Sequence, residues 1–201
     1  MNMTGSFMRF WKKFNAFLLL FLLWAGPVHA VEENDRAKSE VLVKSAELVP
    51  AGEAYQLRAD FDIVFSAEVE EALSKGVPLN FLVEFQLVTP RQYWFDDEIT
   101  TASQNIRLSY HALSRQYLLN ISQHQKTFAT LAEAKDELSR LRDWVVLEKS
   151  QVTPAENYVA MLRFRLDPAK LPKQLQLEAL GSEKWSLVSD PHRWVPNFKT
   201  E

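Results

Sequence analysis

A short segment near the C-terminal end contains the residue types of a hydrolytic triad, Ser186, Ser189, Asp190 and His192, within seven positions. In a triad the base takes the proton of the nucleophile and the carboxylate orients the base, and these side chains normally come from distant segments. No Gly-x-Ser-x-Gly turn, which would expose a nucleophilic serine, accompanies them. We therefore interpret the segment as a polar turn and predict that the protein is not an enzyme.

Acidic residues and histidines are poorly spaced for holding a metal ion. Asp96, Asp97 and Glu98 are consecutive, whereas a calcium loop needs ligands at alternating positions and a glycine for its turn. Three histidines follow residue 30 at spacings unrelated to a metal pair: His111, His124 and His192. The sequence has no cysteine, no phosphate-binding loop and no Gly-x-Gly-x-x-Gly motif. We predict no metal site and no cofactor.

Aromatic and basic side chains are better candidates, and they indicate binding. Tyr93 and Trp94 lie beside an acidic turn, where their rings can offer apolar surface to a ligand or a peptide. His111 and Arg115 lie at the corner of a predicted hairpin, and strand alternation turns His111 outward. Exposed arginine and aromatic side chains are favoured anchors in interfaces. We take these four as candidate binding residues; the alternatives are rings packed in the core and a hairpin corner without a function.

Apolar residues that alternate with polar ones predict that most of the chain forms strands. The segments with this pattern are residues 55–65, 79–88, 106–112, 117–121, 144–147, 158–166 and 185–188. In the segment 158–166, Arg163 and Arg165 fall on the outward face. Residues 175–180 indicate a further extended segment that crosses the core.

Two short helices are predicted between the strands. Ser66 can cap a helix over residues 67–75. Thr130 and Glu133 form a capping box for a second helix over residues 131–143. Strands in hairpin-like order, without βαβ alternation, favour a mainly β fold, an antiparallel β-sandwich with two short helices.

The N-terminal residues have the three-part layout of a secretory signal. A basic flank precedes an apolar run over residues 14–25, which is short of the ~20 residues needed to span a bilayer. We predict cleavage after Ala30, a flexible lead-in over residues 31–39 and a single β-rich domain over residues 40–201, with no stable membrane span after cleavage. The alternative is an uncleaved membrane anchor.

Charge and composition limit the classes of partner. Removal of the predicted signal takes away three of the 23 basic residues and none of the 26 acidic ones, which leaves a net charge of −6. A mildly acidic chain without a run of lysine and arginine is not typical of nucleic-acid binding. The absence of cysteine means that the domain must be held together by its core alone.

Several segments resemble a family, the bacterial exported proteins grouped as the domain of unknown function 4390. The resemblance covers nearly all of the mature chain. It is carried by Gly76-Val77-Pro78-Leu79, Tyr93-Trp94 followed by Asp96, residues 108–117 (LSYHALSRQY), Leu171-Pro172 with Leu175, and Trp185-Ser186-Leu187 with Ser189 and Trp194. The resemblance implies an exported protein of Gram-negative bacteria, located in the periplasm and accessory to an envelope or sensor system. It assigns no activity, so no catalytic residue carries over.

The sequence therefore predicts a noncatalytic periplasmic binding or protein-interaction domain, with an unknown envelope protein or an apolar ligand as its partner. Two alternatives stay open. One is a hydrolase-like periplasmic enzyme whose polar groups converge only in the fold, and the other is a structural component of the envelope. Ionisable groups that converge in one cleft would favour the enzyme, whereas exposed apolar surface would favour the binding domain.

Overall fold

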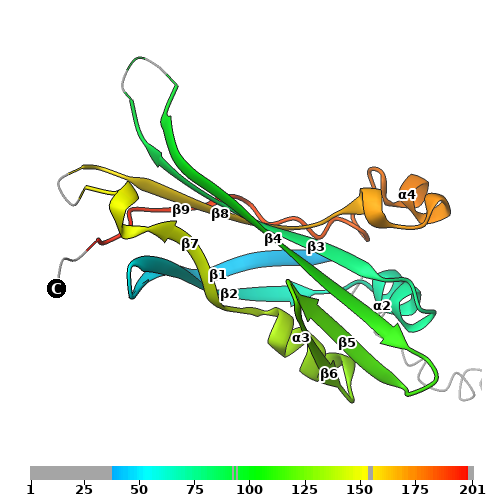
Figure 1. The fold of residues 1–201 in the computed structure, drawn as a ribbon. Coiled ribbons are helices and arrows are strands. Elements are labelled where there is room, and N and C mark those ends of the chain that lie inside the picture. The colour runs from blue at the N-terminus through cyan, green and yellow to red at the C-terminus, as the bar shows by residue number, and fades with distance from the viewer. Residues whose placement is uncertain (1–37, 92, 94, 154–155, 199–201) are drawn as a thin grey trace, which may run out of the picture. The chain divides into compact units, whose positions relative to one another are not determined.

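The computed structural model describes residues 38–198 except 92, 94 and 154–155, and in this part of the chain two antiparallel sheets pack face to face (Figure 1). The smaller sheet has the strand order β1-β2-β7 and the larger sheet the order β6-β5-β4-β3-β8-β9. The predicted mainly β, antiparallel fold is confirmed. The predicted signal, residues 1–30, lies outside the described residues. Of the predicted lead-in, Lys38 and Ser39 are described, and the Ser39 side chain is buried.

The strands of the smaller sheet are β1 (Glu40–Ala51), β2 (Ala54–Val64) and β7 (Arg140–Glu148). Those of the larger sheet are β3 (Leu79–Thr89), β4 (Asp97–His111), β5 (Gln116–Ile121), β6 (His124–Phe128), β8 (Val159–Leu166) and β9 (His192–Trp194). Among the described residues, the helices are α2 (Ala67–Ser74), α3 (Leu131–Leu138) and α4 (Lys173–Ala179), with short 3₁₀ turns η1 (Lys149–Gln151) and η2 (Pro168–Lys170).

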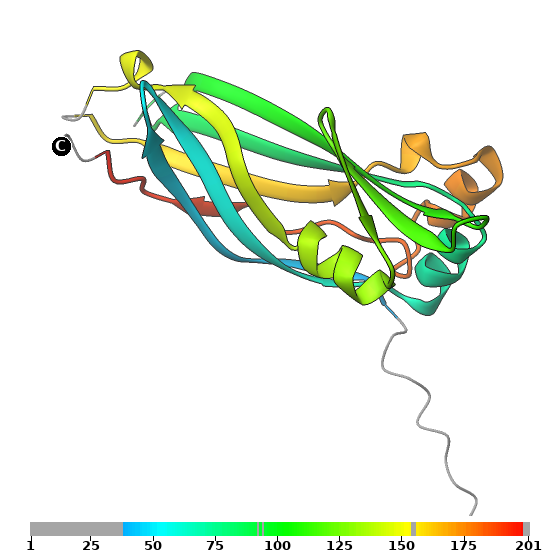
Figure 2. The same cartoon turned by 60° about the horizontal axis from the view of Figure 1, so that its bottom comes forward.

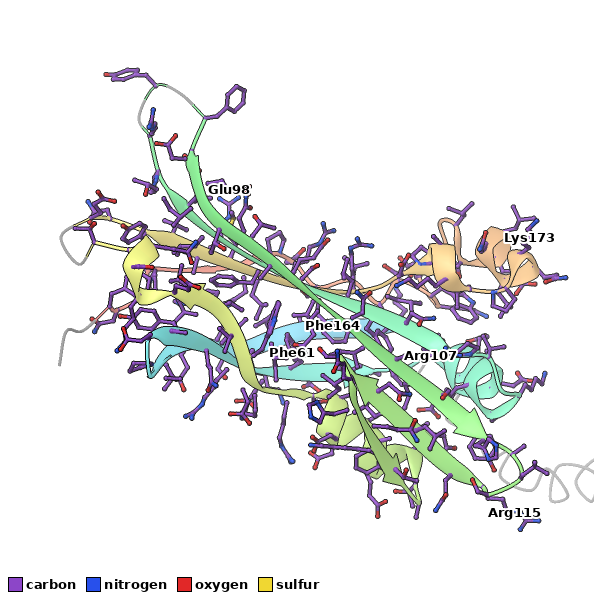
Figure 3. The ribbon with its side chains drawn as sticks, viewed as in Figure 1. Phe61, Glu98, Arg107, Arg115, Phe164 and Lys173 are labelled. Atoms are coloured by element: carbon purple, nitrogen blue, oxygen red, sulfur yellow. The ribbon has the colours of Figure 1, made fainter. Side chains whose placement is uncertain are left out.

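The core lies between the two sheets and follows from the alternation of apolar residues. In β3 the inward side chains are fully buried, namely Phe81, Val83, Phe85 and Leu87. One pair of aromatic rings joins the two sheets, Phe61 of β2 and Phe164 of β8 (Figure 3), whose ring centroids are 5.0 Å apart. Within the larger sheet, the ring centroids of Phe164 and Phe81 are 5.2 Å apart. In Figure 2 the strands of the smaller sheet lie side by side over the larger one. Helix α3 contacts β5 and β6 beside them.

Both predicted helix starts are confirmed. The Ser66 side chain accepts a hydrogen bond from the Val69 N–H, and Thr130 and Glu133 form the capping box. The predicted end of the second helix is wrong, because α3 stops at Leu138. Leu141 continues the helical spacing, yet it is a buried strand residue that pairs with Ala59 of β2. Tertiary strand pairing overrides the local helical pattern here.

Two predictions about the C-terminal part are wrong. Residues 175–180 were expected to be extended and to cross the core, but most of them form α4, and Leu177 and Leu180 are 76% and 72% exposed. Residues 185–188 were expected to be a strand, but Val188 forms only an isolated bridge to Arg165, and the closing strand is β9. The segment before β9 nevertheless fills the core, since Trp185 and Leu187 are buried.

Candidate binding surfaces

The tip of the β3–β4 hairpin exposes large aromatic rings. Tyr93 is 85% exposed and Phe95 is 95% exposed; Trp94, the other candidate in this loop, lies outside the described residues. Figure 1 shows the hairpin running beyond the neighbouring strands of the larger sheet. Most surface apolar atoms belong to small or scattered groups, so rings this exposed at one loop tip are unusual.

Polar contacts brace this hairpin next to its loop. Arg91 forms an ion pair with Asp97, and the Arg91 N–H donates a hydrogen bond to Asp96 Oδ1 at 3.2 Å. On the same hairpin, Gln86 Nε2 donates to Glu98 Oε2 at 2.9 Å. The acidic residues that the sequence shows next to the aromatic residues therefore connect the chain on the two sides of the loop. Such contacts lower the entropy that these flanking residues lose when a partner binds.

The other two candidate residues lie at the β4–β5 turn. His111 Nδ1 accepts a hydrogen bond from the Ser114 N–H and lies 2.9 Å from Ser114 Oγ. Arg115 has φ = 52°, a left-handed conformation that suits a tight turn. His111 is exposed, as predicted, but its ring closes the turn. Beside them Leu113 is 93% exposed.

The structure does not bring the aromatic and basic candidates together. Tyr93 precedes β4, whereas His111 ends it and Arg115 follows it. The strand has 15 residues, which at a rise of about 3.3 Å per residue span roughly 45 Å. Figure 3 shows Glu98 and Arg115 at opposite ends of this strand. Any binding role of the two turns therefore belongs to two separate surfaces.

Two of the triad-like residues near the C-terminal end, Ser189 and His192, hold the C-terminal segment against β8 of the larger sheet. Ser189 is buried, its N–H donates to the Phe164 carbonyl at 2.8 Å, and its Oγ accepts from the Phe164 N–H at 3.0 Å. His192 begins β9 and pairs with Leu162. Both residues thus attach the C-terminal segment to the edge of β8.

Groups with shifted pKa values are spread over the domain. A hydrogen bond from Arg142 lowers the pKa of Asp60, and one from Lys184 lowers the pKa of Glu68. Burial raises the pKa of Tyr158 and of Tyr117. Hydrogen bonds to Glu84 raise the pKa of Arg165. The residues described here also contain no group of three or more histidine, aspartate or glutamate side chains that could hold a metal ion.

A shallow hollow of about 540 Å³ lies on the outer face of the larger sheet. Its walls come from β3, β4, β8 and β9 and include Arg163 and Arg193. The sequence pattern placed Arg163 outward, but the alternation of one strand does not show which strands lie beside it. A smaller hollow of about 400 Å³ lies between α2 and α4 and is lined in part by Leu175 and Trp185.

These features define a mainly β, two-sheet domain with an aromatic hairpin tip and a hollowed outer sheet face. The family model for the domain of unknown function 4390 matches residues 38–195, so the chain belongs to this family. No curated protein and no solved structure matches the chain. None of the helices in the described residues is long and apolar enough to cross a membrane.

The β4–β5 turn provides the first testable prediction. We expect the His111→Ala, Arg115→Ala double variant to lower the free energy of unfolding by about 0.5 kcal/mol or less, because both side chains are exposed and His111 bonds only to Ser114 within the turn. Urea denaturation measures this change. We expect the variant to complement the phenotype of a deletion strain. Normal stability together with lost complementation would instead identify this turn as a binding site.

Proposed function

We propose that this protein is a noncatalytic periplasmic interaction domain that binds an envelope protein through the tip of the β3–β4 hairpin. The observation that carries the proposal is the exposure of Tyr93 and Phe95, at 85% and 95%, on a braced hairpin. Burying one such ring against a partner stabilises a complex by roughly 1.5–3 kcal/mol. Aromatic anchors of this kind account for much of the binding energy in protein interfaces.

The distribution of ionisable groups supports a noncatalytic role. A catalytic acid or base is usually held in a cleft by groups that shift its pKa. Here Asp60, Glu68 and Arg165 each owe their shifted pKa mainly to a hydrogen bond with one oppositely charged side chain. The three pairs lie on different parts of the fold, in agreement with a structural role for each.

The periplasmic location rests on the signal-like pattern of the first thirty residues and on the exported family that the chain resembles. An accessory role in an envelope or sensor system agrees with an interaction domain whose binding surface is a loop tip. A partner with an apolar pocket of matching size would bury both rings at once.

Site-specific photocrosslinking in living cells tests the hairpin tip. We expect p-benzoylphenylalanine in place of Tyr93 to give a specific crosslinked protein after irradiation. The matched control is the same group in place of Leu113, which is 93% exposed at the β4–β5 turn. The Leu113 position should give no such product, because the two turns lie on separate surfaces.

Functional variants complete this test. The Tyr93→Ser, Phe95→Ser variant should keep the wild-type melting temperature and lose complementation of a deletion strain, while Leu113→Ser keeps both. Full complementation by the double serine variant would contradict the proposal. Crosslinks to lipid rather than protein at position 93 would assign the tip to the membrane surface instead.

A further inference from the structure

The outer face of the larger sheet carries three arginine side chains, of which one is paired within the sheet. Arg165 binds Glu84 in a two-pronged ion pair, with Nε and Nη2 at 3.1 and 3.2 Å from the two carboxylate oxygens. Arg163 and Arg193 are exposed, and neither side chain makes a hydrogen bond or an ion pair with any residue that the structure describes. Two glutamates lie near them, but Glu84 is bound to Arg165 and Glu98 accepts a hydrogen bond from Gln86.

The strand register places these two arginines next to each other. Arg163 lies opposite Glu84, and Arg193 lies opposite Met161, two residues before Arg163 on β8. Such diagonal neighbours on one face of an antiparallel pair are about 7–8 Å apart. Both side chains line the hollow of about 540 Å³. Two guanidinium groups can therefore reach one ligand that lies in it.

The rest of the lining limits the chemistry of that ligand. Polar side chains that can donate or accept hydrogen bonds surround the arginines, including Gln86, Thr101 and Ser103, while Leu82 and Met161 add apolar surface. Glu84 and Glu98 also line the hollow, and their carboxylates can accept hydrogen bonds from a ligand. A polypeptide with acidic side chains meets both requirements, because its backbone N–H groups can donate to the glutamates while its carboxylates bind arginine.

We propose that this hollow is a second binding surface, which takes an acidic segment of a partner polypeptide with its carboxylates on Arg163 and Arg193. The surface lies on the part of the β3–β4 hairpin next to its loop, where Glu98 is labelled in Figure 3. It goes beyond the hairpin-tip function and does not depend on it, because neither Tyr93 nor Phe95 lines the hollow.

A labelled hexaglutamate peptide is the probe for this surface, and fluorescence anisotropy at low salt measures its binding to the mature protein. We expect saturable binding that weakens with added salt. The Arg163→Gln, Arg193→Gln variant should bind about tenfold or more weakly, since charge-assisted hydrogen bonds to both arginines are lost. The matched control Arg58→Gln, Lys149→Gln removes the same charge from exposed positions outside the hollow and should bind within about twofold of wild type.

Backbone amide chemical shifts locate the peptide. We expect hexaglutamate to shift the signals of Gln86, Thr101 and Ser103, which line the hollow. Three results would overturn the proposal: no saturation by hexaglutamate, equal loss of binding in the two double variants, or tighter arginine-dependent binding of a heparin oligosaccharide. The third result would assign the face to an anionic glycan. Crosslinking at Tyr93 is unaffected by each of these results, so the two proposals fail separately.

Discussion

Replacing Phe164 with alanine is expected to lower the free energy of unfolding by about 3–5 kcal/mol, the usual cost of removing a buried phenylalanine ring. Phe164 is fully buried, and its ring lies 5.0 Å from Phe61 of the smaller sheet and 5.2 Å from Phe81 of the larger one. The substitution therefore leaves a cavity at the contact between the sheets. A typical domain is stable by only 5–15 kcal/mol, so much of the stability is lost.

Chemical denaturation with circular dichroism measures this effect. The Phe164→Leu variant keeps most of the apolar volume and should lose about 1–1.5 kcal/mol. The Leu113→Ala variant alters a side chain that is 93% exposed and should change stability by less than about 0.5 kcal/mol. If Phe164→Ala were no more destabilising than Leu113→Ala, the two sheets would not share this core.

A second large effect is expected at Ser66, where the Ser66→Ala variant should lower the free energy of unfolding by about 2–3 kcal/mol. The Ser66 hydroxyl donates to the Lys184 carbonyl at 2.9 Å and accepts from the Val69 N–H at 3.2 Å, and the residue is fully buried. The Ser66 N–H also donates to Ser39 Oγ at 3.0 Å. Loss of the hydroxyl leaves a buried N–H without a partner and removes one contact to the C-terminal segment.

Thr130 is the matched control for Ser66, because it caps α3 through the same kind of hydrogen bond but is exposed to solvent. Water can replace the lost hydroxyl there, so Thr130→Ala should cost only about 1 kcal/mol. Thermal unfolding of both variants separates the two costs. Equal losses would mean that burial adds nothing to the cap at Ser66.

Local signals explain the parts of the fold that the sequence predicts well. In β3 and β8 every second residue is apolar and buried, and the positions of Phe81, Phe85 and Phe164 agree with that pattern. The starts of α2 and α3 are set by side chains that hydrogen-bond to backbone groups three residues away. Such short-range chemistry is readable from neighbouring residues alone.

The strands that escaped prediction lack such a pattern. β1 contains a bulge between Val43 and Ser45, which shifts the alternation by one residue and hides the strand. β6 has the sequence HQKTF and is mostly exposed, so it has no apolar face to detect. The hollow could not be predicted either, because it needs the pairing of β8 with both β3 and β9.

The hydrogen bonds between Ser39 and the backbone near Lys184 also determine when the domain can be completed during synthesis. The two residues are 145 positions apart, and the segment that follows Lys184 supplies the buried Trp185 and Leu187. A growing chain that has not reached these residues lacks part of its core. It also lacks the Glu183 and Lys184 carbonyls that accept hydrogen bonds from Ser39, the residue before β1. Long-range contacts of this kind form late and slow folding. The domain can therefore complete its core only after almost all of the chain has been made.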